Sequence, residues 1–123
     1  MSLVLADTSV WVAHFRKANP ALQTMLSADQ VLCHPMVLLE IACGTPPAPR
    51  VRTLSDFRQL RSATVANTDE TLALIEQEQL QDSGCGAIDL LLLGSVLLTS
   101  HAVLWTLDKN LEALAARFDI SFD

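Results

Sequence analysis

Short apolar runs that end at polar residues constrain the fold of this chain more than any other feature. Three of them occupy residues 3–6, 31–34 and 103–106. They are too short for buried helices and lack the alternation typical of a strand with one face in water. They therefore predict strands covered on both faces, as in a parallel sheet.

Residues between these runs carry helical spacing and helix boundary signals. The expected helices are 8–15, 20–27, 36–42, 51–60, 67–82, 87–100 and 109–117. In the helix 67–82, Thr68 is the expected cap and Leu72, Ile75 and Leu80 are expected to face inward. Residues 63–66 and 120–122 are expected to add a short strand and an edge strand. Strands that alternate with helices predict an α/β fold, a three-layer α/β/α sandwich around a short, mainly parallel central sheet.

Composition favours one domain with an aliphatic core. The chain has 123 residues, of which 50% are hydrophobic and 5% aromatic, and this length suits a single domain over residues 1–123. Cys33, Cys43 and Cys85 form no Cys-x-x-Cys pair, so we expect buried, reduced thiols rather than zinc ligands or disulfides.

Neither a secretion signal nor a membrane segment is expected. Asp7 ends the first apolar run too early for a signal peptide. Residues 90–107 carry no formal charge, but small and polar residues interrupt them and no basic flank follows. This pattern favours a central buried helix followed by a strand over a membrane span, and we expect a cytoplasmic protein.

Charge is unevenly distributed along the chain. The net charge of −6 argues against loose binding to nucleic acid. Residues 1–61 contain six basic and four acidic residues, a balance of +2, whereas residues 62–123 contain two basic and ten acidic residues, a balance of −8. A phosphate-facing surface is therefore expected in the first half. The arginines of residues 50–61 have two open interpretations, an RNA or partner contact and a solvated helix flank.

Four acids lie against or within apolar segments: Asp7, Glu40, Asp89 and Asp108. A carboxylate removed from water without a partner costs roughly several kcal/mol, so each should be hydrogen-bonded, paired with a cation or gathered around a metal. Asp7 and Asp108 follow strands, which places them at the carboxyl edge of a parallel sheet, where ligands bind. Glu40 and Asp89 lie on helices that can bring them over the same edge.

Each acid also has a purely structural interpretation. Asp7 can cap the helix that begins at Thr8, Asp89 can lie near a helix N-terminus, and Asp108 can be a turn residue before the next helix. Glu40 can be an ordinary glutamate on a helix surface. These alternatives stay open from the sequence alone.

Convergence of the four acids would demand a cation, because several neighbouring carboxylates cannot all stay ionised without one. Hard oxygen ligands select Mg²⁺ or Mn²⁺ over zinc. Such ions bridge phosphate oxygens and activate water for phosphodiester cleavage. An acidic protein can hold a polyanion in this way.

The acids belong to an ordered set of segments that spans nearly the whole chain. These are Asp7-Thr8-Ser9-Val10-Trp11, Glu40 in a short helix that ends at Gly44, Asp89 at the start of an apolar helix, and Leu104-Trp105-Thr106-Leu107-Asp108. In this order and at these intervals they resemble the PIN-domain ribonucleases, and most closely the VapC-like toxins of type II toxin–antitoxin pairs.

This resemblance implies a Mg²⁺- or Mn²⁺-dependent endoribonuclease with a PIN-like fold. Asp7, Glu40, Asp89 and Asp108 would form the catalytic, metal-binding site, with Asp7 and Asp89 as direct ligands and the other two completing the pocket directly or through water. Ser9 and Thr106 correspond to hydroxyl positions that orient acids or substrate. The resemblance further implies a homodimer and a VapB-like antitoxin that blocks the acidic pocket.

The chain departs from the family pattern at two positions. Members often carry a further acid two residues after the fourth, where this chain has Asn110, and many carry a basic residue where this chain has Leu107. The missing acid bears on a second metal position rather than the first.

Two other functions fit parts of the sequence. A phosphatase could use Asp7 as its nucleophile, although Ser9 stands where a second aspartate is expected. A non-catalytic partner-binding domain would leave four acids in apolar settings without a chemical reason. His14, His34 and His101 are not expected to be catalytic, and Trp11 and Trp105 are expected to pack in the core rather than stack on bases.

Overall fold

A four-stranded, fully parallel sheet forms the centre of the molecule. The computed structural model describes residues 2–122, and its sheet has the strand order β3-β2-β1-β4. The strands are β1 (Leu3–Ala6), β2 (Val31–Cys33), β3 (Arg61–Ser62) and β4 (Ala102–Trp105). In this register Leu5 lies opposite Leu32 and Leu104, and all three side chains are fully buried. The apolar runs are thus covered on both faces, as predicted.

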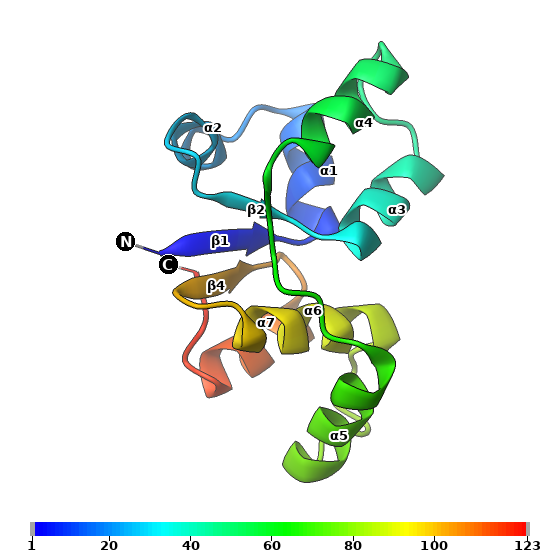
Figure 1. Ribbon diagram of the computed structural model, residues 1–123, viewed down its shortest axis with the longest axis vertical. Coiled ribbons are helices and arrows are strands. Elements are labelled where there is room, and N and C mark those ends of the chain that lie inside the picture. Colours follow the sequence, from blue (N-terminus) through cyan, green and yellow to red (C-terminus); the bar gives the residue numbers. More distant parts are fainter. Residues whose placement is uncertain (1, 123) are drawn as a thin grey trace.

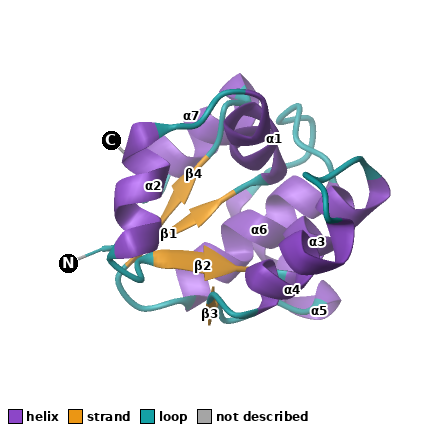
Figure 2. Ribbon diagram, turned by 90° about the horizontal axis from the view of Figure 1, so that it is seen from above, coloured by secondary structure: helices purple, strands orange, loops and turns teal. Residues whose placement is uncertain are grey.

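Helices lie on both sides of the sheet. They are α1 (Thr8–Arg16), α2 (Pro20–Ser27), α3 (Pro35–Cys43), α4 (Arg50–Arg58), α5 (Thr68–Glu78), α6 (Ala87–Leu98) and α7 (Lys109–Arg117). In Figure 1, α1 to α4 lie above the strands and α5 to α7 below them. Figure 2 shows the strands side by side, with β1 between β2 and β4. The predicted three-layer α/β/α sandwich is confirmed.

Helix α6 is the central helix of its layer. Residues 92–96 are buried, and the helix packs against β4, α5 and α7. A helix enclosed in this way needs apolar residues around most of its circumference, which explains the Leu-rich sequence. The last turn differs from the prediction, because Leu97 and Leu98 are exposed.

Several predicted boundaries and burials were wrong. Strand β3 precedes the predicted segment 63–66, because Ala63 bonds through its backbone N–H to the end of β2 and the chain then turns away. Asn67, not Thr68, caps α5, since its side chain and that of Glu70 form a reciprocal capping box. Leu72 is 57% exposed. Residues 120–122 form a single bridge, between Ser121 and Leu104, rather than an edge strand.

The cysteines are free, as expected, but less buried than expected. Cys43 is exposed and Cys33 and Cys85 are half-buried. Within residues 2–122, no helix is long and apolar enough to cross a membrane.

Candidate active site

Asp7 is the buried carboxylate of the candidate site. It follows β1 and caps α1, and its side chain is 5% exposed. Oδ1 accepts hydrogen bonds from the Ser9 hydroxyl (2.5 Å) and the Val10 backbone N–H (3.3 Å), while Oδ2 accepts one from the Thr106 hydroxyl. A carboxylate offers about four acceptor positions. Three are occupied, so one remains on Oδ2.

The two hydroxyls that bind Asp7 have their orientation imposed by the backbone. Ser9 Oγ accepts the Leu107 N–H (3.0 Å) and Thr106 Oγ1 accepts the Asp108 N–H (3.0 Å). Because each oxygen faces an obligate donor, each hydroxyl hydrogen is left for Asp7. Donation from both sides holds the Asp7 carboxylate in one orientation and fastens the connection after β4 to the turn after β1.

Glu40 lies next to this turn and is exposed to solvent rather than buried. It is on α3, which packs against α1. The Thr8 hydroxyl donates to Glu40 Oε1 (2.6 Å), so one carboxylate oxygen is held and the other stays available. Thr8 was not among the predicted site residues, because its partner Glu40 lies 32 residues further along the chain.

Asp89 is half-buried in the first turn of α6. Burial raises the pKa of its carboxyl, an effect opposed by the Gly86 backbone N–H and reinforced by the negative charges of Asp108, Asp7 and Glu40. All three other acids of the predicted set therefore act on Asp89, which places the four in one electrostatic neighbourhood. Perturbation by burial and like charges is typical of functional sites.

Asp108 caps α7, with Oδ1 accepting the Leu111 N–H (2.9 Å). It is exposed. The structural interpretation of Asp7 as a helix cap is therefore correct, whereas Asp108, interpreted as a turn residue, is itself the cap of the helix that follows. Neither cap excludes a second role, because a capping carboxylate keeps unused acceptor positions.

The four carboxylates lie in one electrostatic neighbourhood, but they do not converge closely enough to surround a single ion. Between residues 2 and 122, no three His, Cys, Asp or Glu side chains are grouped closely enough to form a ready-made metal site. Over the same range, the ion pairs are Arg52–Asp56, Arg61–Asp29 and Arg117–Glu78, so none neutralises the four acids. Uncompensated carboxylate oxygens with free acceptor positions fit a hard divalent cation.

The raised pKa of Asp89 predicts that the folding stability of the metal-free protein depends on pH. A carboxyl whose pKa is higher in the folded than in the unfolded state favours folding when protonated, so stability falls as pH rises from the unfolded pKa through the folded one. Asp89→Asn should remove this loss. We expect the melting temperatures of wild type and variant, measured with a chelator from pH 3 to 8, to diverge as pH rises, with the variant higher at neutral pH. Parallel curves would contradict this expectation.

The tryptophans pack as predicted. Trp11 is 5% exposed and meets Phe57 edge-on, with ring centroids 4.9 Å apart. Trp105 is half-buried and stacks on Phe122 at 4.3 Å.

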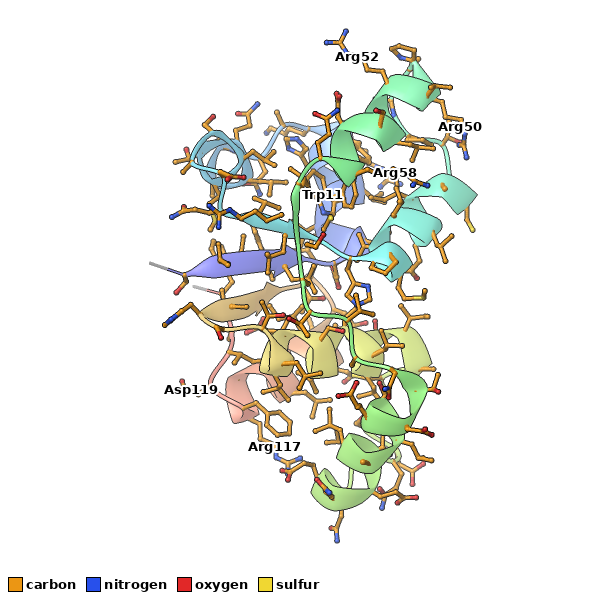
Figure 3. All side chains as sticks on the ribbon, viewed as in Figure 1. Trp11, Arg50, Arg52, Arg58, Arg117 and Asp119 are labelled. Carbon is orange, nitrogen blue, oxygen red and sulfur yellow. The ribbon has the colours of Figure 1, made fainter. Side chains whose placement is uncertain are left out.

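The arginines of α4 divide into two kinds. Arg52 and Arg58 project from the helix (Figure 3) and are exposed, whereas Arg50 donates to the backbone carbonyls of Ala42 and Gly44 and so caps the end of α3. Arg50 is thus held by the backbone, whereas Arg58 and Arg52, which forms a solvent-exposed pair with Asp56 (3.9 Å), can meet a phosphate.

Fold and site together define a nuclease-like class of α/β domain, and this chain belongs to the PIN domain family, whose model matches residues 4–117. Among individual proteins, it is 40% identical over 119 residues to Ribonuclease VapC32 of Mycobacterium tuberculosis strain CDC 1551 / Oshkosh. The match covers 97% of this chain and 95% of the relative. The same values hold for Ribonuclease VapC32 of strain ATCC 25618 / H37Rv.

Proposed function

We propose that this protein is a Mg²⁺- or Mn²⁺-dependent endoribonuclease and the toxin of a toxin–antitoxin pair, acting as one domain over residues 1–123. The observation that carries the proposal is the buried Asp7 carboxylate, which accepts hydrogen bonds from two hydroxyls and shares an electrostatic neighbourhood with three further acids, none of which forms an ion pair within residues 2–122. Near-complete coverage of a relative named as a ribonuclease supports the same activity.

The chain's own residues have distinct roles in this proposal. Asp7 and Asp89 would hold the ion, and Glu40 and Asp108 would complete the pocket directly or through water. Ser9 and Thr106 fix the orientation of the Asp7 carboxylate, because each hydroxyl donates a hydrogen bond to one of its two oxygens. When bound, the ion would supply charge neutralisation at the scissile phosphate and activation of water.

The alternative phosphatase function has less support. A phosphatase of this kind is expected to carry a second aspartate two residues after the first, and Ser9 at that position instead donates a hydrogen bond to Asp7 Oδ1. This contact suits a carboxylate whose position is fixed for binding an ion.

A partner and an assembly belong to the proposal by family membership. We infer a cognate VapB-like antitoxin, an RNA substrate, a homodimer and action in the cytoplasm. The acidic site offers such an antitoxin a target for a basic side chain, since none of its four carboxylates forms an ion pair with the residues that the structure describes.

Metal removal tests the activity. Labelled RNA incubated with the purified protein and Mn²⁺ should be cut, cutting should stop with excess chelator, and it should return when Mn²⁺ is restored. Cutting that persists in chelator would reject a metal-dependent nuclease. Release of phosphate from a small phosphomonoester without RNA cutting would favour the phosphatase.

Arg52 and Arg58 should contribute to RNA binding. The double variant Arg52→Gln/Arg58→Gln should weaken RNA binding several-fold and reduce the slope of log affinity against log salt by about one per lost phosphate contact. The turnover number should change little, because both residues lie on α4 (Figure 3), which carries none of the four acids.

Arg117→Gln, which removes one positive charge, provides the matched charge control for each of the single variants Arg52→Gln and Arg58→Gln. Arg117 lies in the opposite half of the molecule and pairs with Glu78 (3.2 Å). An equal loss of RNA affinity in the control would show that total charge, not α4, is responsible.

A further inference from the structure

A buried polar contact joins the two helices that carry Glu40 and Asp89. His34 Nε2 lies 2.9 Å from Ser95 Oγ, and the two residues are 1% and 0% exposed. His34 follows β2 and caps α3, the helix of Glu40, while Ser95 lies on α6, the helix of Asp89. This contact is named the His34–Ser95 bridge below.

The hydrogens of this bridge can be assigned from its surroundings. His34 Nδ1 accepts the Met36 backbone N–H (3.0 Å), so Nδ1 carries no hydrogen and the neutral ring has its hydrogen on Nε2. Ser95 donates to the Leu91 carbonyl (2.8 Å) and accepts the Ala66 N–H (3.0 Å). The direction is therefore fixed, with His34 donating to Ser95, and every polar group is satisfied. Burial also lowers the pKa of His34, in accord with a neutral ring.

The bridge lies where it can set the spacing of the acids. Leu5 of β1 pairs with Leu32 of β2, so Asp7 and His34, each two residues further, occupy matching positions at the ends of neighbouring strands. Glu40 comes six residues after His34 on α3, and Asp89 six residues before Ser95 on α6. Each acid is thus about 9 Å along a helix from the tie.

Because each acid lies about 9 Å along its helix from the bridge, a tilt of that helix by about 10° would move the acid by roughly 1.5 Å. Displacements near 1 Å are enough to cost about 100-fold in a catalytic rate. Loss of the His34–Ser95 bridge would therefore displace the acids and lower the catalytic rate even if the core stayed folded.

We propose that His34 and Ser95 are positioning residues, whose bridge holds α6 against the β2–α3 junction and thereby sets the separation of Asp89 and Glu40. The proposal rests on the proposed function, in that these acids share a divalent ion. It assigns the bridge a role in metal affinity and turnover beyond its contribution to core stability.

Two substitutions separate the bridge from the helix cap. In His34→Asn, the side-chain oxygen can still accept the Met36 N–H, as asparagine does at helix caps, but the side chain is too short to reach Ser95. In His34→Gln, the longer amide can donate to Ser95 in place of Nε2 while the cap is lost. Thr71→Val is the control for a lost buried hydroxyl, because Thr71 is buried and bonds only within α5, to the Asn67 carbonyl (2.9 Å).

Calorimetric titration with Mn²⁺ and steady-state RNA cleavage measure the outcome. His34→Asn should bind Mn²⁺ about 3- to 10-fold more weakly, less than the roughly 10- to 100-fold lost when a ligand's own partner is removed, and should lower kcat with KM for RNA unchanged. His34→Gln should stay within about 2-fold of wild type, a margin below the loss expected without the bridge, and Thr71→Val should match wild type whatever its melting temperature. Nitrogen-15 spectra should show the ring protonated on Nε2.

Several results would overturn the proposal. These are an unchanged Mn²⁺ affinity in His34→Asn, an equal loss in His34→Gln or Thr71→Val, and a ring protonated on Nδ1. A wild-type protein that binds Mn²⁺ without cutting RNA would overturn the proposed function and leave the Mn²⁺ comparison valid, whereas one that binds no Mn²⁺ would overturn both.

Discussion

Asp7→Asn should reduce Mn²⁺-dependent RNA cleavage by at least about 100-fold, the upper end of losses seen when only a ligand's partner is removed. The amide nitrogen cannot accept a hydrogen bond, so one carboxylate oxygen is lost together with the negative charge. The amide must also face hydroxyls whose hydrogens point inward from Ser9 and Thr106, which should cost about 1–3 kcal/mol of stability. Cleavage of labelled RNA, Mn²⁺ titration and thermal melting of the same preparation measure these effects.

Asp119→Asn is the matched control for this charge change. Asp119 is exposed, follows α7 and lies in the half of the molecule opposite α4 (Figure 3), and it has a left-handed backbone with φ of 59°, which asparagine tolerates. Its activity should equal that of wild type. If Asp7→Asn is folded and still cuts RNA at the wild-type rate, Asp7 is not part of the reaction centre.

Leu93→Ala should cost about 2–5 kcal/mol of unfolding free energy, because it opens a cavity where the surrounding side chains cannot fully relax. Leu93 lies within the buried stretch of α6 and is 0% exposed. Chemical denaturation followed by circular dichroism measures the loss.

Leu97→Ala tests the same substitution one turn further along α6. Leu97 is 39% exposed, so truncation removes little buried surface and alanine favours the helix. We expect a change below about 1 kcal/mol. Similar losses at Leu93 and Leu97 would show that α6 is not enclosed as described.

The fold could be predicted from the sequence wherever one element has a single dominant signal. Strand β1 and helices α2 and α7 have their predicted bounds, since an apolar run, a proline at the first helical turn, and a capping aspartate mark them. Strand β3 could not be predicted, because Arg61 and Ser62 are exposed and pair with β2 only through their backbone. Helical spacing at Leu72 was misleading for a similar reason, since α5 has α6 on one side only and exposes the rest.

The site was predictable in its members and less so in its environment. Apolar neighbours in sequence suggested that all four acids would be buried. Only Asp7 is buried, because Glu40 faces solvent in the last turn of α3 and Asp108 faces solvent just before α7. The contact of Thr8 with Glu40 and the His34–Ser95 bridge join residues 32 and 61 positions apart. Nothing in the local pattern indicates such pairs; the sheet order brings them together.

The hydrogen bond between Thr106 and Asp7 joins residues 99 positions apart, and its consequence concerns how the protein is made. The Asp7 turn is synthesised well before β4 and Thr106. Until residue 106 has been added, the Asp7 carboxylate lacks one of its two hydroxyl donors, and the strand that pairs with β1 on the side opposite β2 is absent. The environment of Asp7 is therefore completed only after β4 has joined the sheet.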